Sequence, residues 1–526
     1  MSRRGKWLLS AGIVAAIGAI ALFVAAILIS RNFEPYIRQQ TIEYLEQRFD
    51  SQVELTALRV RVPPLAALSL LRPGSERLVT VEGEGLSIRH RGRQDVPPLF
   101  VLRKFAASIG SRTLFGDPKT VPLVTLNGME INIPPKGERP KFGGESKPPA
   151  AELPEKKSGV VIQRVDIHNA KLAILPKDPS KIPLRFNLLN VQLESAGKDV
   201  AMKYDAVLTN PKPPGEIHSN GTFGPWAAGE PSETPLAGSY LFENADLAVF
   251  KGIAGILRST GEFEGRLEAI AVRGAASVPD FRLTRSGNAV SLTTKFEVLV
   301  DGTNGNTTLK PVQATLGETK FATSGAIIKH EGERRRAITL DVSMPNGRMR
   351  DVLTLAMKGA PFMEGALELH TQIAIPPVTG KVKERLLLDG RFNVTNGKFL
   401  RSKIQDQVDG LSRRGQGAPK NLEIDEVVSR MTGSFNLENE VITFKTLAFA
   451  VSGAAVNLTG NYDIDRDQLD FRGALMLDAK VSQTMSGWKR WVLKPADPFF
   501  SKHGAGTFLK IKILGTAKEP KFGRDR

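Results

Sequence analysis

The stretch Ala455–Leu477, AVNLTGNYDIDRDQLDFRGALML, alternates apolar and polar residues on both sides of a short charged segment. Successive residues of a β-strand point to opposite faces, so this alternation predicts a half-buried antiparallel hairpin with its turn at Asp465–Gln468. The opposite face carries polar residues such as Thr459 and Arg472. One face is expected to carry the apolar set of Val456, Leu458, Tyr462, Ile464, Leu469, Phe471, Leu475 and Leu477.

Similar alternation recurs along much of the 526-residue chain, which predicts a mainly β protein. Four short segments place two apolar residues around a polar centre that contains Asn: LNGMEI from Leu126, IHNAKL from Ile167, VTNGKF from Val394 and LENEVI from Leu437. Asn and Gly tolerate the positive φ that tight hairpins require, so these segments are interpreted as hairpin turns of one reused architecture.

Short helices are predicted between the strands. DLAVFKGIAGIL from Asp246, MRDVLTLAMKG from Met349 and FLRSKIQDQVDGLSRRGQG from Phe399 each have apolar residues at helical spacing. KVSQTMSGWKRWVLKP from Lys480 is predicted to form a helix at a membrane interface, because it combines tryptophan with basic residues: Trp488, Lys489, Arg490 and Trp491. The alternative for this fourth segment is a helix that caps the end of a sheet.

The segment Leu8–Ile29 contains no charged residue and is predicted to be a transmembrane anchor. Its 22 residues would span about 33 Å as a helix, which is enough to cross a bilayer core. Basic residues precede it, so the N-terminus is expected in the cytoplasm and the bulk of the chain outside it. A cleaved signal peptide is the alternative. Representative anchor positions are Leu8, Ile17, Phe23 and Ile29.

The composition is that of a basic protein rich in phenylalanine, which fits either an ordinary Phe-rich core or an apolar surface that holds something apolar; a generally solvated basic surface is the alternative for its charge. The net charge is +17, which suits an anionic surface nearby, and 26 phenylalanines stand against 5 tyrosines and 4 tryptophans. The chain has no cysteine, which excludes disulfides and thiolate chemistry. Residues 134–159 are rich in Pro, Gly, Lys and Glu, and we expect them to form a disordered insertion between two strands.

No catalytic or cofactor motif stands out in the chain. The six histidines include no pair at i, i+4, and neither a phosphate-binding loop nor a nucleophile elbow is evident. The sequence therefore predicts no enzyme activity, no metal ion and no cofactor. Because the basic residues are dispersed, we expect membrane phospholipids rather than nucleic acid as the anionic partner.

The chain resembles the AsmA-like family of bacterial envelope proteins. The resemblance rests on an N-terminal anchor followed by β-meanders and on three segments in order: LLLDGRFNVTNGKFL from Leu386, GSFNLENEVITF from Gly433 and GAGTFLKIKILGTAKEPKF from Gly504. It implies an elongated, curved antiparallel β-sheet groove with short capping helices, similar to bridge-like lipid-transfer proteins. The 134–159 insertion departs from that pattern. Alternation alone fits a closed β-sandwich equally well.

The expected organisation has five parts: residues 1–30 as cytoplasmic tip and anchor, 31–133 as an N-terminal helix and β-region, 134–159 as the insertion, 160–378 as a middle β-meander and 379–526 as the AsmA-like C-terminal region. The resemblance implies an inner-membrane, periplasmic protein that binds or conducts phospholipid between envelope membranes and supports outer-membrane homeostasis. Outer-membrane or periplasmic proteins are further candidate partners. The alternative is a scaffold that assists outer-membrane protein assembly and binds no lipid.

Overall fold

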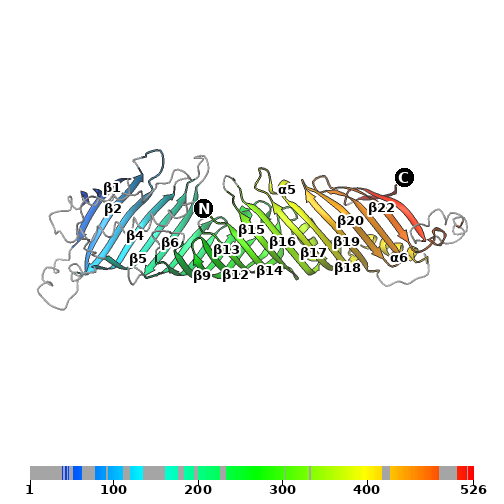
Figure 1. Ribbon diagram of the computed structural model, residues 1–526, viewed down its shortest axis with the longest axis horizontal. Helices are drawn as coiled ribbons and strands as arrows, with labels where there is room; N and C mark the ends of the chain where they lie inside the picture. Colours follow the sequence, from blue (N-terminus) through cyan, green and yellow to red (C-terminus); the bar gives the residue numbers. More distant parts are fainter. Residues whose placement is uncertain are drawn as a thin grey trace. The chain divides into compact units, whose positions relative to one another are not determined.

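The protein is mainly β, as predicted. The computed structural model describes residues 38–39, 42–43, 46, 51–61, 78–90, 93–110, 119–133, 160–175, 183–194, 200–225, 233–302, 304–330, 333, 335–417, 427–484, 494, 506–517 and 519–525. The described part of the chain is 68% strand and contains 24 strands (Figure 1). None of the described helices has the length and apolar character needed to cross a bilayer. The predicted anchor positions Leu8, Ile17, Phe23 and Ile29 lie outside the described residues.

The chain divides into two compact units, and β11 (Ile256–Arg266) and β12 (Ala269–Leu283) contribute residues to both. In the first unit each strand from β1 to β9 pairs with the next one along the chain. Its strands are β1 (Ser51–Arg61), β2 (Leu78–His90), β3 (Phe100–Gly110), β4 (Lys119–Ile133), β5 (Val160–Ile174), β6 (Leu184–Glu194), β7 (Met202–Pro211), β8 (Pro214–Phe223) and β9 (Pro235–Asp246).

One pair in the first unit corrects the prediction of a wholly antiparallel sheet. β4 and β5 are parallel, with Lys119 opposite Val160 and Ile133 opposite Ile174. Parallel neighbours need a crossover connection that returns the chain to the starting end of the strand. Residues 134–159 make this connection and lie outside the described residues. The predicted insertion therefore stands between two strands that are neighbours in the sheet.

The core of the first unit lies on one face of β1–β5. Leu55, Val81, Leu86 and Leu102 are at most 1% exposed there. The described residues of an N-terminal helix contribute to this cover, because Ile42 packs against the core. Polar bonds also join this helix to β1: the Arg38 Nε donates to the Leu55 carbonyl, and the Val53 N–H donates to Glu46 Oε1.

The second unit holds the remaining strands and the short helices. β14 to β24 pair in chain order, and every ladder is antiparallel. The strands are β10 (Ile253–Ala254), β13 (Val290–Val300), β14 (Thr307–Leu316), β15 (Thr319–Ile328), β16 (Ala337–Arg348), β17 (Met363–Ile375), β18 (Leu387–Phe399), β19 (Ser429–Glu438), β20 (Val441–Val451), β21 (Ala454–Asp463), β22 (Gln468–Leu477), β23 (Thr507–Gly515) and β24 (Pro520–Arg524). The helices are η3 (Leu247–Val249), α4 (Met349–Ala356), α5 (Val382–Arg385), α6 (Ser402–Gly415) and η4 (Val481–Thr484).

Three of the four predicted hairpin turns are instead irregularities inside strands. Gly128, Asn169 and Asn396 have φ of +67°, +53° and +53°, but they lie within β4, β5 and β18. At Asn396 the ladder register shifts between Val394 and Gly397, which marks a β-bulge, whereas the ladders beside Gly128 and Asn169 keep their register. Only LENEVI forms a turn, between β19 and β20, where Asn439 has a φ of +50°.

The helix predicted from Asp246 is also wrong. Asp246 does cap a helical turn, because its Oδ1 accepts from the Ala248 N–H at 2.9 Å, but this turn is only the three-residue η3. Gly252 and Gly255 then adopt φ of +108° and +139°, and the chain enters β10 and β11. These glycines interrupt a pattern whose apolar spacing suited a helix. The helices predicted from Met349 and Phe399 are present as α4 and α6.

Candidate functional site: the apolar face of the second unit

The hairpin predicted from Ala455 to Leu477 is formed by β21 and β22. Val456 lies opposite Leu475, and Tyr462 lies opposite Leu469. Residues directly opposite one another in a ladder share a face, so the predicted set lies on one face except for Ile464. Ile464 lies in the turn, because Asp463 pairs with Gln468 and the turn occupies residues 464–467.

The register extends this face across ten strands, β14 to β23. We call it the apolar face: the side of these strands on which Leu458 and Phe471 lie. No ladder position on it between β14 and β23 carries a charged side chain in the described chain. Its larger residues on the central strands are Leu340, Val342, Met344, Leu367, Leu369, Ile373, Leu388, Phe392, Val394, Met431, Phe435, Leu437, Ile442, Phe444, Leu447, Phe449 and Val451.

Phenylalanine rings line the centre of the apolar face. Phe435 lies opposite Phe444 in the ladder, with ring centroids 6.4 Å apart, and Phe444 lies 5.6 Å from Phe471. Glycines leave room for these rings on neighbouring strands. A Cβ added to Gly433 would lie 2.7 Å from the Phe392 ring. Several of the many phenylalanines in the sequence thus lie on this face.

Helices cover one end of the apolar face, which we call the helix rim. α4 packs Val352 and Leu353 against the buried cluster of Met344, Met363, Leu367 and Val394. α6 docks beside it mainly through polar groups. Gln405 Nε2 donates to the Val427 carbonyl at 3.0 Å, and Ser412 Oγ donates to the Ser452 carbonyl at 2.8 Å.

Most of the apolar face outside the helix rim is only partly buried. Of the predicted hairpin residues, Leu458, Phe471 and Leu477 are 8%, 6% and 6% exposed. Val456, Tyr462, Leu469 and Leu475 retain more exposure than these three. Side chains of neighbouring strands therefore shield the centre of the hairpin, while its other apolar residues still reach solvent.

The opposite ends of β16–β22 form a second rim that carries charges, which we call the turn rim. Lys383 of α5 lies 2.7 Å from Glu440 in the β19–β20 turn and 3.5 Å from Asp465 in the β21–β22 turn. Arg285 reaches the same place, with Nη1 3.4 Å from Glu440 Oε2 and Nη2 2.6 Å from the Ile464 carbonyl. Glu440 pairs with both cations, so its carboxylate holds two turns and a helix together.

Tyr462 lies where the apolar face meets the turn rim. Its hydroxyl donates to Asp467 Oδ1 at 3.0 Å. Burial first, and then this carboxylate, disfavour the phenolate and raise the pKa of Tyr462 to about 12. The side chain therefore carries an uncharged polar group at the margin of an uncharged face.

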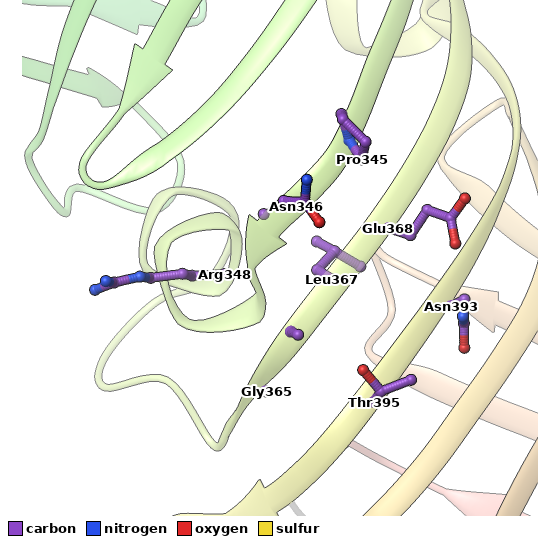
Figure 2. Close-up of a pocket in the computed structure, with 10 residues that line it drawn as sticks. Pro345, Asn346, Arg348, Gly365, Leu367, Glu368, Asn393 and Thr395 are labelled. Atoms are coloured by element: carbon purple, nitrogen blue, oxygen red, sulfur yellow. The ribbon is translucent and has the colours of Figure 1, made fainter.

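A separate depression of about 450 Å³ lies mainly on the polar side of β16–β18. Figure 2 shows Pro345, Asn346, Glu368 and Asn393 on neighbouring strands, with Arg348 extending away from them. Register shifts in both ladders open this depression. Arg348 forms an ion pair with Glu318. No group of metal-binding side chains occurs among the described residues.

The sequence patterns did not identify the charged residues of the turn rim, because Arg285, Lys383 and Glu440 are far apart in the chain and belong to no motif. The predicted interface helix residues Trp488, Lys489, Arg490 and Trp491 lie outside the described residues. No family model, curated protein or solved structure matches the chain.

Proposed function

We propose that this protein binds or conducts phospholipid between envelope membranes, with acyl chains on the apolar face and head groups toward solvent. In this proposal, Leu8–Ile29 anchors it in the inner membrane, the bulk is periplasmic, and the activity supports outer-membrane homeostasis without catalysis. The observation that carries it is an apolar face without charge across ten strands. Each methylene group moved from water onto this face would contribute about 0.8 kcal/mol.

The ladder order favours a groove over a sandwich. In a sandwich, two sheets bury their apolar faces against each other. Here β14 to β23 are successive neighbours, so their apolar sides line one continuous surface. The alternative of a scaffold that binds no lipid has no comparable feature in its favour.

Contacts of one loop favour a sheet that curves around the apolar face. Asn288 donates to the carbonyls of Thr354, Met357 and Gly359 after β16, while Arg285 reaches the turn before β22. In a flat sheet, β16 and β22 would stand six strand spacings apart, about 29 Å. Three residues of chain span at most about 11 Å, and the side chains of Arg285 and Asn288 add their own lengths to this reach. Curvature of the second unit accounts for both contacts.

A loading assay with the full chain tests the proposal. Donor vesicles carry a phospholipid with a fluorescent acyl chain, and transfer of the probe to the protein is measured. Leu475→Asp places a charge on the apolar face, and we expect it to lower loading about tenfold, equivalent to about 1.4 kcal/mol. The matched control is Ala474→Asp, which points to the polar face opposite Lys510 and should load normally.

Unfolding temperatures of both variants establish that they fold. Absence of loading by the unmodified chain, or equal loading by the two folded variants, would contradict the lipid proposal and favour the scaffold alternative.

A further inference from the structure

Two arginines of the turn rim bind one short loop. Arg335 lies between β15 and β16, and Arg385 ends α5 between β17 and β18. The Arg335 Nη1 donates to the Val378 carbonyl at 3.1 Å and to the Gly380 carbonyl at 2.6 Å. The Arg385 Nη1 donates to the Pro376 carbonyl. Both guanidinium groups are therefore held by carbonyl groups of residues 376–380 at the turn rim.

No carboxylate of the described residues lies within ion-pair distance of either guanidinium group, although the nearby Glu333 has a buried Oε2 without a hydrogen-bond partner. Neither arginine forms an ion pair there, and the nearby Glu384 is engaged by the N–H of Lys381 at 3.0 Å and by its Nζ at 3.8 Å. The buried Nε of Arg385 has no hydrogen-bond partner. Burial and the charge of Arg335 lower the pKa of Arg385. An anion would stabilise these two neighbouring positive charges and could accept a hydrogen bond from the Arg385 Nε.

The apolar face begins directly beside these arginines. Ile338 lies three residues after Arg335 and is paired with Ile375, which precedes Pro376. Leu388 lies three residues after Arg385 and is paired with Ile373 on the same face. A molecule with a phosphate at one end and acyl chains at the other matches this order of cationic rim and apolar surface.

We propose that Arg335 and Arg385 bind the phosphate of an acyl-bearing ligand whose chains lie on the apolar face at Ile338, Ile375 and Leu388. This inference rests on the proposed function and names the part of the lipid that the protein recognises. Guanidinium groups suit phosphate because their planar donors form charge-assisted, paired hydrogen bonds with its oxygens.

The test compares phosphatidate with diacylglycerol that has the same fluorescent acyl chains, presented to the full chain. We expect phosphatidate to load about tenfold better, corresponding to about 1.4 kcal/mol. The double variant Arg335→Gln, Arg385→Gln should lose this preference and keep the loading of diacylglycerol. The control Arg430→Gln, Arg472→Gln removes two exposed charges from the polar face and should keep the preference.

A second measurement, chemical modification of arginines, uses the unmodified chain and so does not depend on how a variant folds. Phenylglyoxal modifies arginines, and phosphatidate should protect Arg335 and Arg385 in the unmodified chain without protecting Arg472. The variant Arg335→Lys, Arg385→Lys keeps the charge and should retain part of the preference, which a purely structural clamp on residues 376–380 would not produce.

The outcomes separate the two proposals. Diacylglycerol loading without a preference for phosphatidate overturns the phosphate site and leaves the groove standing. Loading of neither lipid overturns both proposals. Equal protection by inorganic phosphate and by phosphatidate identifies a free-phosphate site and overturns the acyl-bearing ligand. A parallel fall in diacylglycerol loading and unfolding temperature assigns the arginines to structure alone.

Discussion

Leu458 and Thr459 are neighbours in β21 whose side chains have opposite surroundings. Leu458 is 8% exposed on the apolar face, whereas Thr459 is exposed on the polar face opposite Arg472. We predict that Leu458→Asp lowers the free energy of unfolding by about 3 kcal/mol or more, because the carboxylate loses solvent without gaining a partner. Thr459→Asp should change it by less than about 0.5 kcal/mol. Denaturant unfolding measures both, and equal effects would contradict the assigned faces.

The raised pKa of Tyr462 predicts a specific alkaline response. The folded chain holds the phenolic proton up to about pH 12, against an ordinary pKa of 10. The stabilisation from the neutral hydroxyl is therefore complete below about pH 10 and is lost as the pH rises from 10 to 12. Tyr462→Phe should lose less stability than the unmodified chain between pH 9 and 11.5. Parallel pH profiles of the two unfolding temperatures would show that Tyr462 titrates normally.

The alternation of apolar and polar residues predicted which residues of the hairpin share a face, with Ile464 as the one error. Strand period predicts which residues share a face, and the ladder confirms this for Val456, Leu458 and Tyr462. Ile464 was wrong because local bonds decide where a turn begins. The Arg466 N–H donates to Asp463 Oδ1 at 2.9 Å, and Asp467 adopts a φ of +54°, which together place the turn one residue earlier.

Among the elements, β21 depends on a glycine at its crossing with β22. A Cβ on Gly460 would lie 2.1 Å from the Asp470 carbonyl oxygen, and its φ is +155°. We predict that Gly460→Ala destabilises the protein by about 2 kcal/mol, because the backbone must move. Gly410 in α6 has nothing within 4 Å of the same position, so Gly410→Ala should stabilise by about 0.5 to 1 kcal/mol. A tolerated Gly460→Ala in thermal unfolding would contradict the ladder geometry.

The parallel pair of β4 and β5 sets a minimum length for the connection between them. The chain must return from Ile133 to Val160, about 46 Å for strands of this length. We predict that replacing residues 134–159 with 16 glycine and serine residues preserves the pair. Eight residues would reach about 32 Å at most and should break it.

Cysteines at Asn127 and His168, which are opposite one another, report the result. A disulfide should form with the 16-residue connection and fail with the eight-residue one. Its formation with both would contradict the parallel register. The composition of residues 134–159 could predict a connection poor in apolar residues, but no local pattern identifies a crossover.

Element types were harder to predict than faces. Asn and Gly tolerate positive φ inside strands as well as in turns, so three predicted turns lie within strands, and one of them, at Asn396, is a β-bulge. In α6 the buried residues are Gln405, Val408, Ser412 and Gly415, because docking relies on polar bonds and close approach. Of the apolar stripe through Leu400, Ile404, Val408 and Leu411, only Val408 is among these buried residues, so the stripe predicted the helix better than its packed side.

For the whole molecule, alternation alone could not distinguish an open face from a closed core. Both arrangements need one apolar side on every strand, and the ladder order, on which our proposal of an open face rests, is not contained in any local pattern. The charged side chains of the turn rim, including Arg335 and Arg385, were also beyond sequence reasoning, because topology gathers them from connections between different strands. Some of the basic residues that are dispersed in the sequence thus lie together at the turn rim, at one edge of the apolar face.

Site-specific photo-crosslinking in the full chain tests the central claim most directly. A photoreactive residue at Val456 or Leu475 is placed on partly exposed positions of the apolar face, and one at Asn457 or Arg472 on the polar face serves as the control. Mass spectrometry identifies what each position captures. The account predicts phospholipid adducts at Val456 and Leu475 and none at Asn457 and Arg472. Capture of protein alone at Val456 and Leu475 would show that a protein surface covers this face, and it would contradict the proposal that lipid lies there.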